Sequence, residues 1–354
     1  MNRAYNFYAG PSTLPVEVLK RLQKDLPDYE GTGLSFIETS HRSPEYDKVH
    51  TRALALIRDL LRVPDSHDIL LLQGGATLQF GMVPMNIAEE GKPIDFVLNG
   101  AWGKKAKADA EQFGDVRVVS KSPRPEGLDM NSDASYMHIT SNETIGGEQW
   151  QQFPDAGSVP LVADMSSDIM SRSLPVSSFG IIYAGAQKNL GPAGVTVVII
   201  RKDLVDRSSR PLPAYLQYRT HAEKDSLYNT PPVFAIWALS LVLEWIAAKG
   251  GVEKIQSINE KKASMVYEAI DGSGGYYSCP VDTDIRSRMN VVFRLPNEDL
   301  EKQFVAEAKA RDMIGLKGHR SVGGCRASLY NALPVEAAEQ LTDFMKEFRA
   351  AHPA

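Results

Sequence analysis

One lysine, Lys188, lies in a setting that favours nucleophilic chemistry. It belongs to the stretch GIIYAGAQKNLGPAGVTVVII, which spans residues 180–200. Two β-branched apolar runs, Ile181–Ala184 and Val195–Ile200, predict buried strands on either side of a glycine-rich turn. Most lysines are solvated surface groups. A lysine held among apolar groups instead loses pKa and becomes a nucleophile, as a Schiff-base lysine must.

An aspartate, Asp164, follows a further predicted buried strand at Val159–Ala163. One strand and one crossover separate it from Lys188 along the chain. A pyridoxal phosphate site requires a lysine for the cofactor's aldehyde and an acid facing its pyridine nitrogen. An aspartate after a strand is also often a loop residue or a helix cap. The two residues together favour the pyridoxal phosphate interpretation.

Short motifs spread along the chain carry a family resemblance. They are NFYAGPSTLP (6–15), SHRSPEY (40–46), SNETIGG (141–147), AGAQKNLGPAG (184–194), NTPP (229–232) and KGHRSVGGCRASLYNA (317–332). In this order they resemble the class V pyridoxal-phosphate-dependent aminotransferases, and within them the phosphoserine aminotransferase family. The resemblance implies amino transfer between L-glutamate and 3-phosphohydroxypyruvate, giving O-phospho-L-serine and 2-oxoglutarate. Activity on the 4-phosphohydroxy-L-threonine intermediate of pyridoxine synthesis stays open, because the same anion contacts would hold it.

The resemblance also implies which residues contact pyridoxal 5'-phosphate. Lys188 would hold the cofactor and act as general base and acid, Asp164 would pair with its pyridinium, and Trp102 would stack on its ring. Further expected cofactor contacts are Ala76, Thr77, Thr144, Gln187, Asn229 and Thr230. The last two would reach the cofactor phosphate of the partner in a homodimer with shared active sites. Many relatives carry arginine in place of Thr77, so backbone N–H groups at a predicted helix start would contribute more here.

Anionic substrates require a local cluster of donors, because the chain has a net charge of −5, with 39 basic and 44 acidic residues. A guanidinium group pairs two donors with a carboxylate or phosphate in one plane. The resemblance implies substrate binding by Arg42 and Arg326, helped by His41, His319 and Arg320. Basic residues elsewhere are usually solvated. Three lysines after Trp102 are interpreted in that way: Lys104, Lys105 and Lys107.

Alternating strand and helix patterns predict an α/β protein. The resemblance implies the fold type I of pyridoxal phosphate transferases. A large domain of residues 16–255 would hold a mainly parallel sheet of about seven strands with helices on both faces. Residues 1–15 and 256–354 would form a smaller α/β domain. We also predict a mobile loop at 207–228 and a strand at Ala327–Asn331.

Composition is ordinary for a soluble globular protein, with 43% hydrophobic and 23% charged residues. No apolar run approaches the ~18 residues that a membrane helix requires, and no signal-peptide pattern opens the sequence. Two cysteines suit a reducing cytoplasm and lack metal-ligand spacing. We therefore expect a cytoplasmic enzyme with small-molecule substrates, which binds no nucleic acid, membrane or metal.

Two other functions are compatible with parts of this pattern. A cysteine desulfurase of the same fold would carry a nucleophilic cysteine on a mobile loop, and Cys325 lies beside Arg326. A binding protein that retained the fold without catalysis would be expected to lack Lys188 or Asp164, and both are present.

Overall fold

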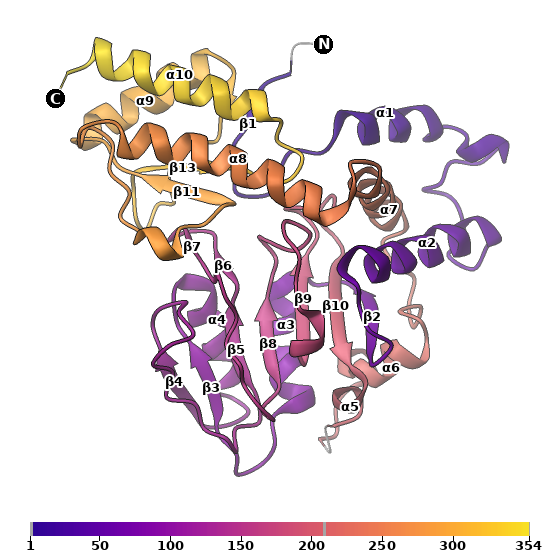
Figure 1. Cartoon of the computed structure of the whole chain (residues 1–354). Helices are drawn as coiled ribbons and strands as arrows, with labels where there is room; N and C mark the ends of the chain where they lie inside the picture. Colours follow the sequence, from indigo (N-terminus) through magenta and orange to yellow (C-terminus); the bar gives the residue numbers. More distant parts are fainter. Residues whose placement is uncertain (1–2, 208–209, 354) are drawn as a thin grey trace.

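A seven-stranded sheet is the centre of the fold in the computed structural model, which describes residues 3–207 and 210–353 (Figure 1). Its strand order is β2-β10-β9-β8-β5-β3-β4. All neighbouring strands are parallel except β10, which runs antiparallel to both β2 and β9. The strands are β2 (His67–Leu72), β3 (Ile94–Val97), β4 (Val116–Ser120), β5 (Met137–Thr140), β8 (Leu161–Asp164), β9 (Ile181–Gly185) and β10 (Thr196–Arg201). The mainly parallel sheet predicted from the sequence is thus confirmed.

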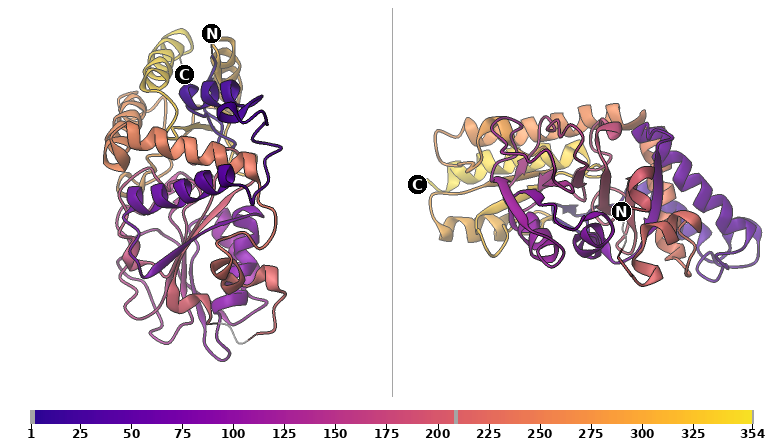
Figure 2. Two further views of the ribbon diagram at one scale, coloured as in Figure 1. Left: turned by 90° about the vertical axis from the view of Figure 1, so that its right-hand side faces the viewer. Right: turned by 90° about the horizontal axis from the view of Figure 1, so that it is seen from below.

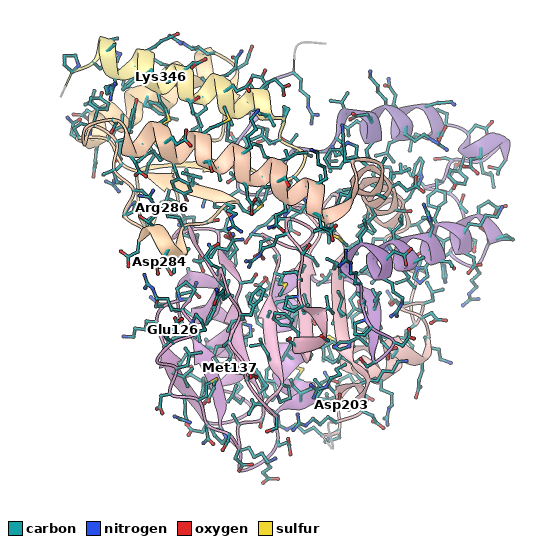
Figure 3. All side chains as sticks on the ribbon, in the orientation of Figure 1. Glu126, Met137, Asp203, Asp284, Arg286 and Lys346 are labelled. Atoms are coloured by element: carbon teal, nitrogen blue, oxygen red, sulfur yellow. The ribbon has the colours of Figure 1, made fainter. Side chains whose placement is uncertain are left out.

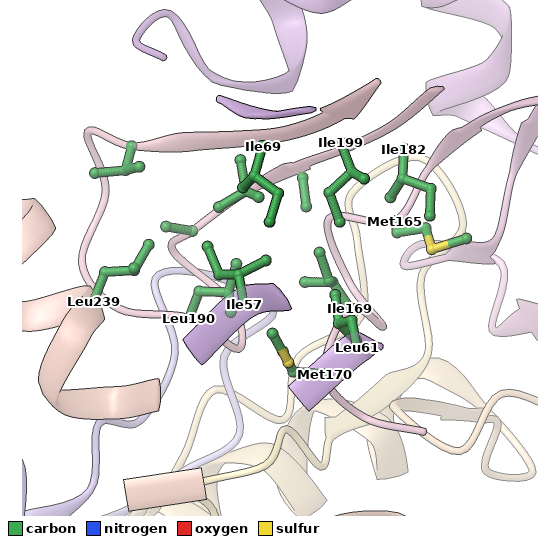
Figure 4. Close-up of a cluster of buried hydrophobic side chains, with 14 of the residues drawn as sticks. Ile57, Leu61, Ile69, Met165, Ile169, Met170, Ile182, Leu190, Ile199 and Leu239 are labelled. Carbon is green, nitrogen blue, oxygen red and sulfur yellow. The ribbon is translucent and has the colours of Figure 1, made fainter. Parts of the chain in front are cut away.

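Helices cover both faces of this sheet, and alternate residues of each strand supply the two packing surfaces. In β9, Ile182 belongs to one buried cluster and its neighbour Tyr183 to another. Figure 4 shows Ile182, Ile69 and Ile199 facing side chains of helices on one face. Helices contributing to that cluster are α1 (Val16–Asp25), α2 (Pro44–Leu61) and α7 (Val233–Ala248). The other face is covered by α3 (Gly75–Ile87), α4 (Ala101–Ala110), α5 (Lys202–Val205) and α6 (Tyr218–Glu223).

The C-terminal part has a separate buried cluster, stacked on the sheet in the side view of Figure 2. The N-terminal arm joins it, because β1 pairs in parallel with β12 and Phe7 is fully buried there. Its elements are β1 (Tyr5–Asn6), α8 (Gly251–Asp271), β11 (Asn290–Phe293), α9 (Glu298–Ala310), β12 (Met313–Ile314), β13 (Cys325–Ser328) and α10 (Val335–Ala351). α8 connects the parts, since Val252 and Ile255 pack in the cluster on the sheet and Val266 packs in the C-terminal one. A domain boundary at residue 255 stays a prediction.

Two sequence predictions are wrong. The predicted strand Ala327–Asn331 lies at Cys325–Ser328, because the chain leaves the sheet after Ser328 and Asn331 donates to the carbonyl of Met170. The predicted mobile loop 207–228 contains α6, in which Tyr218 is buried and donates to Gln79 Oε1 at 2.6 Å. Positions 208–209 of that loop lie outside the described residues.

Figure 3 labels two exposed charged side chains of the C-terminal part, Asp284 and Lys346. Arg124, which follows β4, forms ion pairs with two carboxylates of the C-terminal part, Asp284 at 2.7 Å and Asp282 at 2.8 Å. Within the described ranges no single helix is long and apolar enough to cross a membrane. α7 and α8 pass that test only together, with a bend of 82° between them, and most of α7 is buried in the core.

Candidate active site

A cavity of about 640 Å³ opens where the parallel strands end. Thr140 and Asp164, the last residues of β5 and β8, line it, and Lys188 follows β9. Ligands of α/β sheets bind at this edge, beyond the carboxyl ends of the strands. Of the residues predicted from the sequence, the lining contains Ala76, Thr77, Trp102, Thr144, Asp164, Gln187, Lys188, His319 and Arg326.

The side chain of Lys188 faces this cavity. Its Nζ donates to Thr144 Oγ1 at 2.7 Å. Burial lowers the pKa of Lys188 to about 8, against the opposing effect of Asp164 and Glu143. The N-terminal arm closes the other side: Ser12 donates to the carbonyl of Lys188, and a Cβ on Gly10 would lie 3.4 Å from Lys188 Cγ. The amine therefore has a neutral fraction near neutral pH, as a nucleophile requires.

Asp164 is neither a loop residue nor a helix cap. It ends β8, is only 6% exposed, and its Oδ1 accepts from the backbone N–H of Ser166 at 2.9 Å. Burial raises the pKa of this carboxyl, while Ser166 and Lys188 act in the opposite direction. A buried carboxylate that interacts with Lys188 is suited to a protonated ring nitrogen inside the cavity.

The indole of Trp102 forms one wall of the cavity, at the start of α4. Its ring centroid lies 5.8 Å from Lys188 Nζ. Lys105, one turn later, places its Nζ 4.5 Å from the same ring. Lys104 and Lys105 are exposed, as predicted for a solvated face, and the ammonium group of Lys105 lies over the Trp102 ring. The three-residue spacing between Trp102 and Lys105 was the sequence signal for this contact, because residues at i and i+3 are neighbours on a helix.

The start of α3 forms another wall and can receive a phosphate. Gly74 and Gly75 have φ of 88° and 67°, in the left-handed region that favours glycine. Gly74 provides no side-chain cap, so N–H groups of the first turn stay available. Thr77 lines the cavity there and is exposed.

These residues fit pyridoxal phosphate. Lys188 offers an amine for the aldehyde, Asp164 a carboxylate for the ring nitrogen, Trp102 a ring face, and the start of α3 donors for the phosphate. The hydroxyl of Thr140 adds a buried polar atom at the cavity that has no hydrogen-bond partner among the described residues. The donor set thus matches each part of the cofactor.

Cationic side chains gather at one end of the cavity. Arg326 is 9% exposed, and its Nη1 donates to the carbonyl of Thr144 at 3.1 Å. Burial lowers the pKa of His319, and Arg326, Arg320 and Lys105 lower it further. Arg320 is outside the lining of the cavity but is close enough to contribute to this field. An anionic group would be attracted to this end.

Four predicted residues lie elsewhere within the single chain. His41 and Arg42 line a separate cavity, together with Leu227. Asn229 and Thr230 follow Leu227 closely in the chain and are also outside the lining of the Lys188 cavity. One chain therefore does not bring these four side chains to Lys188.

Cys325 does not have the setting of a nucleophile. It is 1% exposed in β13, opposite Phe293, and belongs to the C-terminal cluster. Burial holds the pKa of its thiol far above the ordinary value, so the reactive thiolate is disfavoured. The geometry argues against the desulfurase alternative, which needs a mobile, ionised cysteine.

Comparisons with known proteins agree with this geometry. The family model described as aminotransferase class-V matches residues 4–341. Phosphoserine aminotransferase of Geobacillus kaustophilus is 56% identical, with 99% of each chain covered, and that of Bacillus subtilis is 51% identical, again with 99% of each covered. The phosphoserine aminotransferase structure from Bacillus circulans subsp. alkalophilus superposes with a TM-score of 0.97 at 50% identity, covering 99% of each chain. A pyridoxal-phosphate-bound phosphoserine aminotransferase from Trichomonas vaginalis gives a TM-score of 0.92 at 39% identity, covering 97% of this chain and 100% of that one. The chain therefore belongs to the class V aminotransferases and, within them, to the phosphoserine aminotransferase family.

Proposed function

We propose that this protein transfers an amino group between L-glutamate and 3-phosphohydroxypyruvate, giving O-phospho-L-serine and 2-oxoglutarate, with pyridoxal 5'-phosphate as cofactor. The observation that carries the proposal is the meeting of Lys188, Asp164 and Arg326 in one cavity. An amine of lowered pKa, a buried acid and a guanidinium are the groups that amino transfer to an α-keto acid requires.

Lys188 and Thr144 carry the proton chemistry in this proposal. Pyridoxal phosphate, when bound, supplies an electron sink for the negative charge that develops at the substrate's α-carbon. Lys188 Nζ accepts the proton from that carbon and returns it later in the cycle, as general base and then acid. Its pKa of about 8 suits both directions of transfer near neutral pH. The hydrogen bond to Thr144 at 2.7 Å orients the amine.

Arg326 and the cations near it bind the substrate's anions. The guanidinium of Arg326, nearly buried beside Thr144, would pair with the α-carboxylate that every substrate carries. His319, Arg320 and Lys105 would attract the distal phosphate or carboxylate. This arrangement selects substrates with two separated anionic groups.

A homodimer with shared active sites belongs to the proposal. His41 and Arg42 line one small cavity with Leu227, so they are neighbours of the segment that carries Asn229 and Thr230. If Asn229 and Thr230 reach the partner's cofactor phosphate, then His41 and Arg42, which lie beside the same segment, would reach the partner's active site as well. Large apolar side chains are exposed nearby in the chain: Leu34 at 52%, Ile37 at 59% and Tyr228 at 47%. A partner subunit would cover them and deliver the missing anion contacts.

A cytoplasmic location completes the proposal, because both cysteines, Cys279 and Cys325, are free thiols. Such thiols are typical of a reducing compartment.

The decisive experiment separates the two half-reactions. Purified holoenzyme is mixed with L-glutamate alone, and loss of the cofactor's yellow absorption is followed. Keto acids are then added singly: 3-phosphohydroxypyruvate, the keto acid of 4-phosphohydroxy-L-threonine, 2-oxoglutarate and pyruvate. We expect glutamate to bleach the absorption and the phosphorylated keto acids and 2-oxoglutarate to restore it much faster than pyruvate. Failure of glutamate to bleach it would refute amino transfer, and equal rates with pyruvate would refute selection for a distal anion.

A further inference from the structure

Glu143 is a buried carboxylate beside the candidate site, and the roles proposed above do not use it. It lies in β6 (Asn142–Glu143), immediately before Thr144, and its exposed fraction is 0%. Its two oxygens accept from backbone N–H groups: Oε2 from Trp102 at 3.3 Å and Oε1 from Ile145 at 3.2 Å. The carboxyl group thereby connects the start of α4 to the segment that carries Thr144.

The packing around this carboxyl group leaves no spare room. A Cβ added to Gly100 would lie 2.3 Å from Glu143 Cδ. Gly100 has φ of 175°, which is extended backbone open to any residue. Glycine at this position therefore allows the Glu143 carboxyl group to lie close to the start of α4. It is not required by a special backbone angle.

Glu143 also interacts with the amine of Lys188. Burial raises the pKa of Glu143 to about 7, and Lys188 acts to lower it. The charged groups that act on Lys188 come from several elements: Asp164, Glu143 and Asp168 raise its pKa, and Arg326 lowers it. Two buried carboxylates, Asp164 and Glu143, thus oppose the effect of burial on one amine.

We propose that Glu143 is a positioning residue for Lys188. Glu143 holds the start of α4, and with it the Trp102 ring, beside the amine, and it supplies a second negative charge that balances the ammonium group of Lys188. Asp164 is committed to the ring nitrogen in the proposed reaction, and Asp168 is paired with Arg172 at 3.2 Å. Glu143 is therefore the carboxylate left to respond when Lys188 gains or loses its proton. The consequence for turnover rests on the proposed function, but the charge balance can be measured without cofactor.

The test compares Glu143→Gln with a control in the same hairpin. Glu148 lies in β7 (Glu148–Gln149), directly opposite Glu143, and burial also raises the pKa of its carboxyl. Its charge partners are Arg124 and Asp282 rather than Lys188, so Glu148→Gln is a matched control. A further variant, Gly100→Ala, keeps the charge of Glu143 but displaces the carboxyl group. Thermal unfolding of all proteins confirms that they fold.

The primary measurement is the pKa of Lys188 in cofactor-free protein, from the pH dependence of its modification by an amine reagent, followed by peptide mass spectrometry. We expect Glu143→Gln to lower this pKa by about one, because a charge that favours the ammonium form is removed. Gly100→Ala should lower it less, and Glu148→Gln should leave it at the wild-type value. If Glu143→Gln does not fold, Gly100→Ala carries the comparison.

The second measurement is kcat and KM of the holoenzyme for glutamate. We expect Glu143→Gln to lower kcat by about tenfold to a hundredfold and to change KM little, since Glu143 lies outside the cavity lining. An unchanged Lys188 pKa in both Glu143→Gln and Gly100→Ala would overturn the inference. A wild-type protein that fails to transaminate would instead refute the proposed function, so the two failures are distinguishable.

Discussion

The Lys188 cavity and the segment around Arg42 differ in how much of a site a single chain forms. One chain brings the predicted catalytic residues together at Lys188, whereas Arg42 lines a separate cavity. Around Lys188, residues from the arm, β6, β8, α4 and β13 line one cavity, in which Asp164 and Arg326 are buried. Around Arg42, the side chains of His41, Arg42, Asn229 and Thr230 are exposed or half-buried, and the Asn229 side chain donates to the carbonyl of its own neighbour, Thr230. The first region brings its proposed catalytic groups together within one chain, and the second is the region proposed to contact a partner subunit.

In the proposed function, this difference separates the groups that carry out the reaction from the groups that select the substrate. Groups that must hold a cofactor in one geometry benefit from a rigid interior, where burial also shifts their pKa values. Groups that recognise the far end of a substrate can be delivered by a partner, because they need only reach the mouth of the cavity. The predictions below test whether the two regions act in these separate ways.

The largest effect is expected for Lys188→Ala. The variant loses both the attachment point for the cofactor and the general base. Turnover should therefore fall by more than the ~10²–10⁴-fold that general acid–base catalysis alone contributes. Turnover is measured with glutamate and 3-phosphohydroxypyruvate, and circular dichroism confirms the fold. Near-normal turnover in the purified variant would remove Lys188 from the mechanism.

The next effect distinguishes Arg326 from Arg42. Removing one partner of a buried charge pair costs roughly 2–5 kcal/mol, or about 30- to several-thousand-fold in kcat/KM. Arg326→Ala should impair phosphohydroxypyruvate, glutamate, alanine and pyruvate alike, because each carries the carboxylate beside the reacting carbon. Arg42→Ala should impair the first two by about tenfold or more and alanine and pyruvate much less. Equal losses across the four substrates in Arg42→Ala would show that this residue does not select the distal anion.

Mixing experiments test whether the second region acts on the partner. Lys188→Ala protein is combined with a double variant, Asn229→Ala and Thr230→Ala, under conditions that exchange subunits. A hybrid dimer would contain one site with an intact Lys188 and an intact contribution from the partner. We expect partial recovery of activity, up to about a quarter of wild type from random pairing. Each variant incubated alone is the control, and a fully active monomer on size-exclusion chromatography would contradict the shared site.

The smallest effect is expected for Lys105→Ala. Lys105 is exposed and lies over the Trp102 ring outside the cavity lining, so solvent and salt screen its charge. We expect a loss of about two- to fivefold in kcat/KM for 3-phosphohydroxypyruvate, smaller at high ionic strength and absent for pyruvate. Lys104→Ala is the matched control, because Lys104 is the exposed neighbour on the same helix. Equal losses in both variants would indicate a general effect of helix charge.

Local sequence signals predicted much of the fold and the centre of the site. The apolar β-branched runs around Lys188 became β9 and β10. Such patterns are local, because burial on a strand or helix imposes a short period on the sequence. The strand before Asp164 was equally clear, so the sequence by itself predicted the candidate amine and acid that line one cavity in the structure.

Only the tertiary structure decided which charged groups meet. Glu143 and Trp102 are distant in the sequence, and no local pattern distinguishes Glu143 from a solvated acid until the fold removes it from water and brings it to Lys188. The same reason explains Lys105, whose ammonium group lies over the Trp102 ring, and Arg42, which lies away from the Lys188 cavity of its own chain. Burial and electrostatic contact depend on the packing of whole elements, and a residue's neighbours in the sequence do not determine that packing.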